Sequence, residues 1–237
     1  MYMDLFKYTL FINLKHRTDR LERVLEELKK MDITGERVDA IKNEKGNIGC
    51  TYSHIKCLTM AKERDYPYVF ICEDDIQFTD PDVLKQNMEK FDSMSKSGFE
   101  WDVLIIGGNT CPPFEKITDN CVRTYNVQTT TGYIVKKHYY DTLLDNFKDG
   151  VYNLIKEPAK KQIYSIDIYW KRLQQTGRWY ITVPLTVNQY YDYSDIEKRV
   201  TDYTQPMLDL EKKGMFSAMR QNQSQSLDSG NIKMNYL

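Results

Sequence analysis

The sequence lacks the segments that would place it in a membrane or direct it into the secretory pathway. No run of apolar residues approaches the ~20 that a membrane-spanning helix requires. Residues 1–4 offer neither the basic start nor the apolar stretch of a signal peptide. We therefore expect a cytoplasmic protein without a transmembrane segment.

Glycine-rich nucleotide loops are also absent. The 237 residues include 11 glycines, and they form neither a GxGxxG pattern nor a P-loop. This disfavours a classical dinucleotide site and a P-loop site. The net charge of −1 implies no general attraction to nucleic acid, and we find no internal repeat.

The five cysteines do not form a recognisable metal or disulfide pattern. They are Cys50, Cys57, Cys72, Cys111 and Cys121. Their number is odd and no CxxC pair occurs, which disfavours both a zinc site and a disulfide scaffold. A bridge between Cys111 and Cys121 is the alternative in an oxidising compartment, but we expect free thiols.

The order of apolar segments predicts the fold class. Strands are expected at 10–14, 37–41, 68–72 and 101–106, with helices between them at about 18–30, 51–64 and from 81 onwards. Such alternation is typical of an α/β fold with a mainly parallel sheet covered by helices on both faces. Further strands are expected at 132–135 and 179–183, and further helices at 139–147 and 165–177.

The helix expected after the first strand has a clear apolar face. Thr18 or Asp19 can cap its start. Its apolar residues recur at helical spacing, namely Leu21, Val24, Leu25 and Leu28. Its charged residues are expected to face solvent, namely Glu22, Glu26, Glu27, Lys29 and Lys30.

Glycine and proline predict where other elements begin and end. Gly46 and Gly49 are expected to frame a turn before the second helix. Asp80 is expected to cap a helix that has Pro81 at its first position. The pair 107–108 is expected to end a strand.

Three consecutive acids, Glu73, Asp74 and Asp75, follow the apolar run 69–72 directly. Ligand sites of open α/β sheets lie at strand ends, and adjacent carboxylates repel one another. A divalent cation would compensate this charge, because carboxylates suit Mg²⁺ or Mn²⁺. Such a cation would hold a phosphate-bearing substrate. The alternative is a solvated turn.

Two further segments have side chains suited to a nucleotide. Ser53 and His54 lie near the start of the second helix, where anions are favoured, and His54 can donate to a phosphate or a sugar hydroxyl. The polar segment 13–20 follows the first strand and can reach a base, ribose or phosphate. The alternatives are a structural histidine and a capped helix start.

Later in the chain, Asp167 lies among apolar residues. A buried acid is costly unless it is paired or functional, so in a sugar-transferring site it would be the general base. The loop 188–196 is polar and aromatic, and its tyrosines could stack on sugars or bases. Because the chain has 18 tyrosines, this signal is weak.

Several motifs in the same order resemble glycosyltransferase family 25, which contains lipooligosaccharide galactosyltransferases and collagen β-galactosyltransferases. The opening motif is Phe11-Ile12-Asn13-Leu14 with Arg17, Asp19 and Arg20. The others are Gly46-Asn47-Ile48-Gly49-Cys50 with Ser53-His54-Ile55, Cys72-Glu73-Asp74-Asp75-Ile76, Thr130-Thr131-Gly132-Tyr133 and Ser194-Asp195-Ile196. They span about residues 9–196, and Cys72 replaces the usual leucine.

The resemblance implies a GT-A fold and a hexose transfer, with inversion, from a UDP-sugar to a glycan or hydroxylysine-type hydroxyl. It implies one domain, 1–213, with a nucleotide-binding half (about 1–110) and an acceptor-binding half (about 111–213). The polar composition after about residue 214 separately predicts a weakly ordered tail at 214–237. The resemblance also implies Mn²⁺, or Mg²⁺, bound by Asp75 and Glu73 in a DxD-type motif.

The resemblance also places individual residues around the donor. The donor-binding set is Asn13, Leu14, Arg17, Ser53, His54, Glu73, Asp74, Asp75, Thr131, Gly132, Ser194 and Asp195. Asn13, Leu14 and Arg17 would lie by the uracil and ribose, and Ser194 and Asp195 in a loop over the diphosphate. We expect Asp167 to be the base, with His54 and Asp192 as rivals.

Two other functions stay open at the level of sequence. A sugar-nucleotide nucleotidyltransferase could use a similar sheet, although it usually has a glycine-rich loop after the first strand, and residues 13–20 contain no glycine. A catalytically weak carbohydrate- or protein-binding module on a transferase scaffold is the other alternative. The sequence does not identify the acceptor or the oligomeric state.

Overall fold

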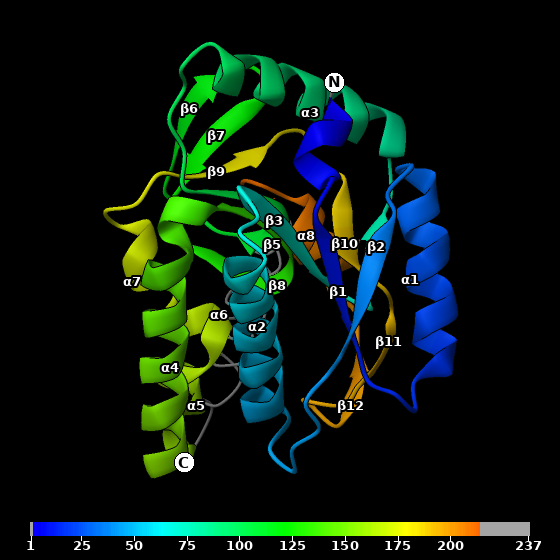
Figure 1. Cartoon of the computed structure of the whole chain (residues 1–237), viewed down its shortest axis with the longest axis vertical. Coiled ribbons are helices and arrows are strands. Elements are labelled where there is room, and N and C mark those ends of the chain that lie inside the picture. Colours follow the sequence, from blue (N-terminus) through cyan, green and yellow to red (C-terminus); the bar gives the residue numbers. More distant parts are fainter. Residues whose placement is uncertain (1, 214–237) are drawn as a thin grey trace, which may run out of the picture.

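An eight-stranded sheet runs through the middle of the molecule in the computed structural model, which describes residues 2–213 (Figure 1). In spatial order its strands are β2 (Gly35–Asp39), β1 (Thr9–Asn13), β3 (Tyr68–Glu73), β8 (Val127–Lys136), β5 (Val103–Thr110), β9 (Trp179–Thr182), β7 (Cys121–Thr124) and β6 (Phe114–Thr118). The tail expected at 214–237 lies outside the described residues.

Most of these strands point in the same direction. β1 is parallel to β2 and β3, and β5 is parallel to β9. β8 runs antiparallel between β3 and β5, and β7 runs antiparallel between β9 and β6. Six of the eight strands therefore share one direction, which confirms the predicted α/β class with a mainly parallel central sheet.

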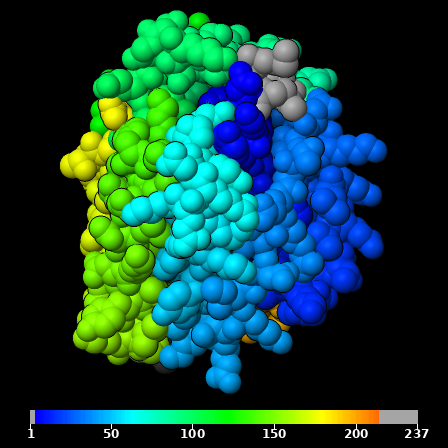
Figure 2. Space-filling model, in the orientation of Figure 1, coloured from blue at the N-terminus to red at the C-terminus, as the bar shows by residue number. Residues whose placement is uncertain are grey.

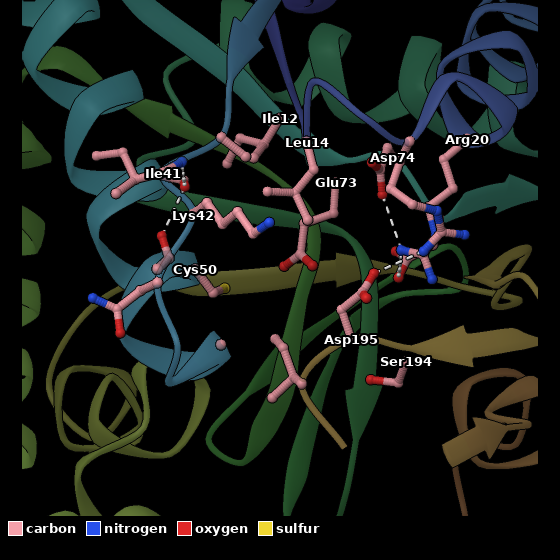
Figure 3. A pocket seen from close by; sticks show the side chains of 18 of the residues that line it. Ile12, Leu14, Arg20, Ile41, Lys42, Cys50, Glu73, Asp74, Ser194 and Asp195 are labelled. Atoms are coloured by element: carbon pink, nitrogen blue, oxygen red, sulfur yellow. Dashed lines mark hydrogen bonds and ion pairs between the residues drawn. The ribbon is translucent and has the colours of Figure 1, made fainter. Parts of the chain in front are cut away.

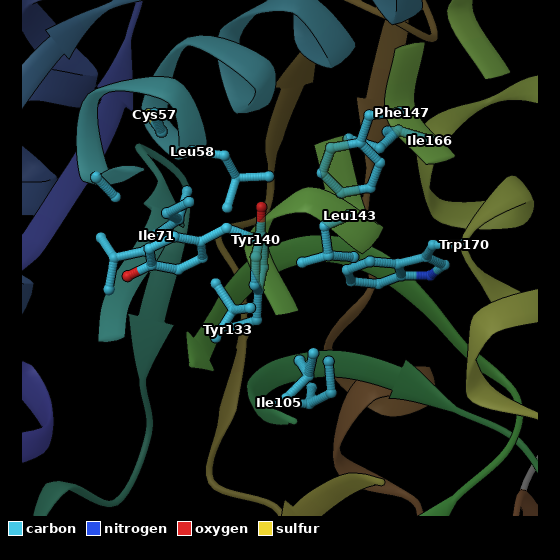
Figure 4. Close-up of a cluster of buried hydrophobic side chains, with 14 of the residues drawn as sticks. Cys57, Leu58, Ile71, Ile105, Tyr133, Tyr140, Leu143, Phe147, Ile166 and Trp170 are labelled. Carbon is cyan, nitrogen blue, oxygen red and sulfur yellow. The ribbon is translucent and has the colours of Figure 1, made fainter. Parts of the chain in front are cut away.

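Both faces of the sheet are buried, because successive side chains of a strand point to opposite sides. Val69 and Ile71 of β3 pack against α2 (Gly46–Glu63) and α4 (Tyr140–Lys156), while Phe70 and Cys72 pack against α1 (Thr18–Lys30) and α3 (Pro81–Lys96). Figure 4 shows the α2–α4 side of this core. On the outer surface, α2 and α4 lie side by side (Figure 2).

Two small antiparallel sheets lie beside the carboxyl ends of the strands. β4 (Ile76–Phe78) pairs with β10 (Val187–Gln189), and β11 (Asp192–Ser194) pairs with β12 (Arg199–Thr201). β4 starts directly after Asp75, so the acids occupy the end of β3 and the turn to β4. The remaining helices are short: η1 (Tyr2–Phe6), η2 (Lys137–Tyr139), η3 (Pro158–Lys160), α5 (Lys161–Tyr164), α6 (Ile166–Tyr169), α7 (Lys171–Gln174) and α8 (Thr204–Leu208).

The glycines expected to form turns lie inside regular elements, so this prediction was wrong. α2 begins at Gly46 and therefore includes Gly49. A Cβ on Gly49 would stand 2.4 Å from the carbonyl oxygen of Ile41, so glycine allows the preceding loop to approach the helix. The pair 107–108 lies within β5, where the pairing with β8 is irregular.

Two expectations for α1 were also wrong. Arg17 occupies the N-cap position, and no side chain caps the helix. Glu27, expected to face solvent, is buried, and its carboxylate accepts hydrogen bonds from the Phe78 amide (2.8 Å) and the Tyr190 hydroxyl (2.7 Å). Leu25 is instead 48% exposed.

The five cysteines are all free, as expected. None of the helices described between residues 2 and 213 is long and apolar enough to cross a membrane. The eight-stranded sheet draws strands from both sides of residue 110. The division into nucleotide-binding and acceptor-binding halves, and the cytoplasmic location, stay predictions.

Asp80 caps α3 as predicted, since its carboxylate accepts a hydrogen bond from the Val83 amide at 3.1 Å. We expect Asp80→Ala to lower the free energy of unfolding by about 1 kcal/mol, because it removes this cap. Urea unfolding followed by circular dichroism measures the change. Asp82→Ala, also an exposed acid of the first turn, is the control with the smaller loss. Equal losses would contradict the capping role.

Candidate functional site

Two adjoining cavities lie at the carboxyl ends of β1 and β3. The larger has a volume of about 330 Å³ and the smaller about 170 Å³. Figure 3 shows residues that line the larger one. The two cavities share the lining residues Arg20, Cys50, Glu73, Asp75, Ser194 and Ile196.

The topology explains why residues from distant segments meet here. β1 and β3 are adjacent and parallel, so their carboxyl ends reach the same edge of the sheet. This edge brings together Leu14 and Arg17 after β1 and the acids at the end of β3. The helix α2 adds Ser53 and His54 to the wall of the larger cavity, and the β11–β12 hairpin adds Ser194 and Asp195.

The three acids have different surroundings. Asp74 is firmly held, because its carboxylate accepts hydrogen bonds from Asn13 (2.7 Å) and Arg20 (3.0 Å). The Asp75 carboxylate has longer contacts, at 3.4 Å from Arg20 and 3.4 Å from Gln189. Asp75 is thus the better placed of the two aspartates to bind a further cation.

Burial raises the pKa of Asp75 to about 7, and the neighbouring charges of Glu73 and Asp74 add to this effect, while Arg20 opposes it. Burial alone would also raise the pKa of Glu73, but hydrogen bonds from His54 and Thr130 lower it. Burial and the neighbouring acids therefore disfavour the charged form of Asp75 by more than Arg20 offsets.

Arg17 at the N-cap of α1, together with Arg20 and Arg23 within it, connects the helix to the β11–β12 hairpin. Arg17 contacts Asp195 at 2.7 Å, Arg23 contacts Asp192 at 2.5 Å, and Arg20 donates to the carbonyl oxygen of Tyr193 at 2.9 Å. These contacts hold the hairpin beside the larger cavity, which Ser194 and Asp195 line.

Ser53 and His54 are buried and held by other protein groups. The Ser53 hydroxyl accepts from the Ile41 amide (2.8 Å) and donates to the Gly49 carbonyl (2.7 Å). His54 has Nδ1 at 3.0 Å from the Tyr133 hydroxyl and Nε2 at 3.3 Å from Glu73 Oε1. Both residues thus position their neighbours in the cavity wall.

Asp167, the expected base, lies at the start of α6 and lines the smaller cavity together with Glu73 and Asp75. Its carboxylate accepts a hydrogen bond from the Thr129 amide at 3.3 Å. Burial raises the pKa of Asp167, and this hydrogen bond partly opposes the shift. The carboxylate is therefore a stronger base than a surface aspartate.

Three of the expected donor-binding residues lie outside both cavity linings. Asn13 lies behind Asp74, with its amide nitrogen on that carboxylate. Thr131 is fully buried, and Gly132 pairs with Cys72 inside the sheet. Thr129 and Thr130, two residues and one residue before Thr131, line the smaller cavity instead.

Other lining residues lie in segments that the sequence singled out but were not named in the predicted donor-binding set. Arg20 belongs to the opening motif and follows Arg17, the N-cap residue of α1, by three residues. This spacing, close to one helical turn, was the signal that Arg20 would face the same site as Arg17. Cys50, Gln189 and Tyr190 also line the cavities. Their proximity depends on contacts between distant segments, so sequence spacing did not reveal it.

Two groups of side chains could bind a metal. Glu73 and Asp75 offer carboxylate oxygens at the boundary of the two cavities. Cys50, His54 and Glu73 form a second group, with one ligand atom each within 4.8 Å of the others. Glu73 belongs to both groups.

Removing the charge of Arg20 tests its role. We expect Arg20→Met to lower the free energy of unfolding by about 3 kcal/mol or more, because it leaves Asp74 buried without its ion pair. Arg23→Met is the control, since its half-exposed ion pairs should contribute about 1 kcal/mol or less. Urea unfolding without divalent metal measures both. A similar loss in the two variants would contradict the assignment.

Comparison with known proteins gives one family match. The sequence model described as glycosyltransferase family 25 (LPS biosynthesis protein) matches residues 44–156. Human procollagen galactosyltransferase 2 is 24% identical over 130 residues, which cover 43% of this chain and 21% of the human protein. The chain therefore spans about a fifth of the length of this curated relative.

Two solved glycosyltransferase structures show distant similarity. A glycosyltransferase involved in glycosylation of the major capsid of PBCV-1 is 12% identical with a TM-score of 0.43, covering 81% of this chain and 95% of that one. A Drosophila β-1,4-galactosyltransferase 7 mutant with manganese, UDP-Gal and xylobiose is 12% identical with a TM-score of 0.36, covering 57% and 51%. At such scores neither likeness carries an argument about function.

The family match includes three of the five motifs, those around Cys50, Glu73 and Gly132. The opening motif and Ser194-Asp195-Ile196 lie outside it. The match to glycosyltransferase family 25 over residues 44–156 supports the family that these motifs predict.

Proposed function

We propose that this chain is a metal-dependent glycosyltransferase that moves galactose or glucose from a UDP-sugar to a hydroxyl of a glycan or a hydroxylysine-type acceptor, with inversion. The observation that carries this proposal is the position of Glu73 and Asp75, which line both cavities. A diphosphate held there would have its sugar at the junction of a donor cavity and an acceptor cavity. The family assignment supports the same class of reaction.

The larger cavity is the proposed donor site. Leu14 and Arg17 would contact the uracil and ribose, while Asn13 would act from behind by fixing Asp74. Ser53 and His54 line the same cavity, and Ser194 and Asp195 would lie over the diphosphate. A volume of about 330 Å³ is within the range of small-molecule sites.

Glu73 and Asp75 would hold Mn²⁺ or Mg²⁺. Their carboxylate oxygens are the ligand type that these ions prefer, and Asp75 is bound only by long contacts to Arg20 and Gln189. A bound cation would stabilise the negative charge that develops on the leaving diphosphate. Asp74, held by Asn13 and Arg20, would fix the conformation of the strand end.

The protein's own side chains would complete the reaction. Arg20 adds a fixed positive charge at the junction of the cavities. Asp167 lines the smaller cavity and not the larger one. It would therefore accept the proton of the attacking hydroxyl from the acceptor side. Attack from the side opposite the diphosphate is what inversion requires.

The rival bases are less suited to this role. Asp192 is paired with three arginines of α1. Burial alone would raise the pKa of Asp192, but the hydrogen bond and charge of Arg23 lower it to about 2, so it is a weak base. His54 has both ring nitrogens occupied, by Tyr133 and Glu73, and would orient Glu73.

Titration calorimetry with UDP tests the metal site. We expect UDP binding to require Mn²⁺ and the affinity to fall at least tenfold in Asp75→Ala, because a ligand of the cation is lost. Asp82→Ala, on an exposed turn of α3, serves as the control with wild-type affinity. Unchanged UDP affinity in Asp75→Ala would remove this residue as a metal ligand.

Asp167→Asn tests the base. We expect kcat to fall by a factor of about 10² to 10⁴, which is typical for loss of general-base catalysis, with little change in UDP affinity. A UDP-release assay measures kcat, and calorimetry measures the affinity. If Asp167→Asn keeps full transferase activity, the base is a different residue.

A donor screen separates this proposal from the two alternatives. UDP-sugars are incubated with Mn²⁺, and UDP released by slow hydrolysis is measured, so no acceptor is needed. Binding without release or transfer from any donor would favour a binding module. Formation of pyrophosphate from a sugar 1-phosphate and UTP would favour a nucleotidyltransferase.

A further inference from the structure

Three chemically different metal-binding side chains meet in the wall of the larger cavity. Cys50 and His54 are four residues apart on α2 and therefore lie on the same face of the helix. Glu73, the last residue of β3, lies opposite them. The Cys50 sulfur, a His54 ring nitrogen and a Glu73 carboxylate oxygen all lie within 4.8 Å of one another.

Their spacing resembles that of ligands around a tetrahedral ion. Zinc binds imidazole nitrogen and carboxylate oxygen at about 2.0–2.2 Å, so two such ligands stand about 3.3 Å apart in a tetrahedral site. His54 Nε2 and Glu73 Oε1 are 3.3 Å apart, which is long for a hydrogen bond to a charged group. A cation between them would need little movement of either side chain.

Outer contacts already orient two of the three ligands. The Tyr133 hydroxyl is 3.0 Å from His54 Nδ1, and the Thr130 hydroxyl donates to Glu73 at 2.5 Å. In the metal-bound state, His54 would carry its proton on Nδ1 and donate it to Tyr133, and Nε2 would exchange its contact with Glu73 for the metal. Such second contacts to ligating residues are a regular feature of protein metal sites.

We propose that Cys50, His54 and Glu73 form a Zn²⁺ site with its fourth position open to the cavity. Thiolate and imidazole suit Zn²⁺, whereas Mn²⁺ prefers oxygen ligands, so the site differs from the one proposed at Asp75. Binding forms a Zn–S bond and releases the thiol proton of Cys50 to the solvent. The two sites share Glu73, so Zn²⁺ would compete with the cation that the proposed transferase requires.

Only this competition rests on the proposed function. The zinc site itself depends on the three side chains and their spacing. No CxxC pair occurs in the sequence, and the site exists only because β3 ends beside the first half of α2.

Cobalt substitution provides a direct test, because Co²⁺ bound to a thiolate shows an intense near-ultraviolet absorption band. We expect this band when Co²⁺ is added to the metal-free full chain, and we expect Zn²⁺ to abolish it. In Cys50→Ser the band should be absent and the Zn²⁺ affinity at least tenfold lower. Cys111→Ser is the matched control, since Cys111 is also a partly exposed free thiol.

Calorimetry in two buffers of different ionisation enthalpy supplies a second measurement. About one proton should be released per Zn²⁺ bound at pH 7 by the wild-type chain, and fewer by Cys50→Ser. No cobalt band in the wild type, or a band that survives in Cys50→Ser, would overturn the site. If Cys50→Ser does not fold, Glu73→Gln should weaken Zn²⁺ binding at least tenfold, and unchanged affinity would overturn the proposal.

UDP titration of the wild-type chain keeps this proposal distinct from the proposed function. A cobalt–thiolate band without Mn²⁺-dependent UDP binding would support the zinc site and overturn the transferase proposal. Mn²⁺-dependent UDP binding without the cobalt–thiolate band would support the transferase proposal and overturn the zinc site. If both occur, added Zn²⁺ should weaken Mn²⁺-dependent UDP binding.

Discussion

The buried negative charge at the end of β3 is the constraint on which the rest of the site depends. Three acids stand side by side at the edge of the sheet, and Arg20 contacts two of them. Desolvation makes such a cluster costly unless positive charge and hydrogen bonds compensate it. Asn13 and Arg20 satisfy Asp74, while Asp75 is left with long contacts and a raised pKa. A cation, as proposed above, would stabilise the charged form of Asp75.

The same constraint organises the neighbouring elements. Arg20 belongs to α1, which follows β1 directly, so the parallel pairing of β1 with β3 brings its positive charge to the acids. From the same helix, Arg17 and Arg23 bind the aspartates of the β11–β12 hairpin. One helix thus compensates the acids and positions the hairpin beside the cavity, which links the charge of the strand end to the shape of the proposed donor site.

Glu73 has a different role from either aspartate. It lines both cavities, contacts His54 and Thr130, and belongs to both groups of side chains proposed to bind a metal. With Asp75 it offers the oxygen ligands that suit Mn²⁺, and with Cys50 and His54 it offers a mixed set that suits Zn²⁺. The choice between these partners would decide which metal the site holds, so a single carboxylate couples the proposed activity to the proposed inhibitory ion.

The sequence by itself determined the α/β class, the strand that precedes the three acids, the Asp80 cap and the resemblance to glycosyltransferase family 25, because these depend on local periodicity and on residues adjacent in the chain. Tertiary structure alone decided that Glu27 is buried against Phe78 and Tyr190, that Arg20 contacts the acids, and that Cys50 lies beside Glu73. Arg20 and Tyr193, for example, are 173 residues apart in the sequence. Local patterns specify which face of an element is apolar, but the burial and charge of a polar side chain depend on whichever distant segment packs against it.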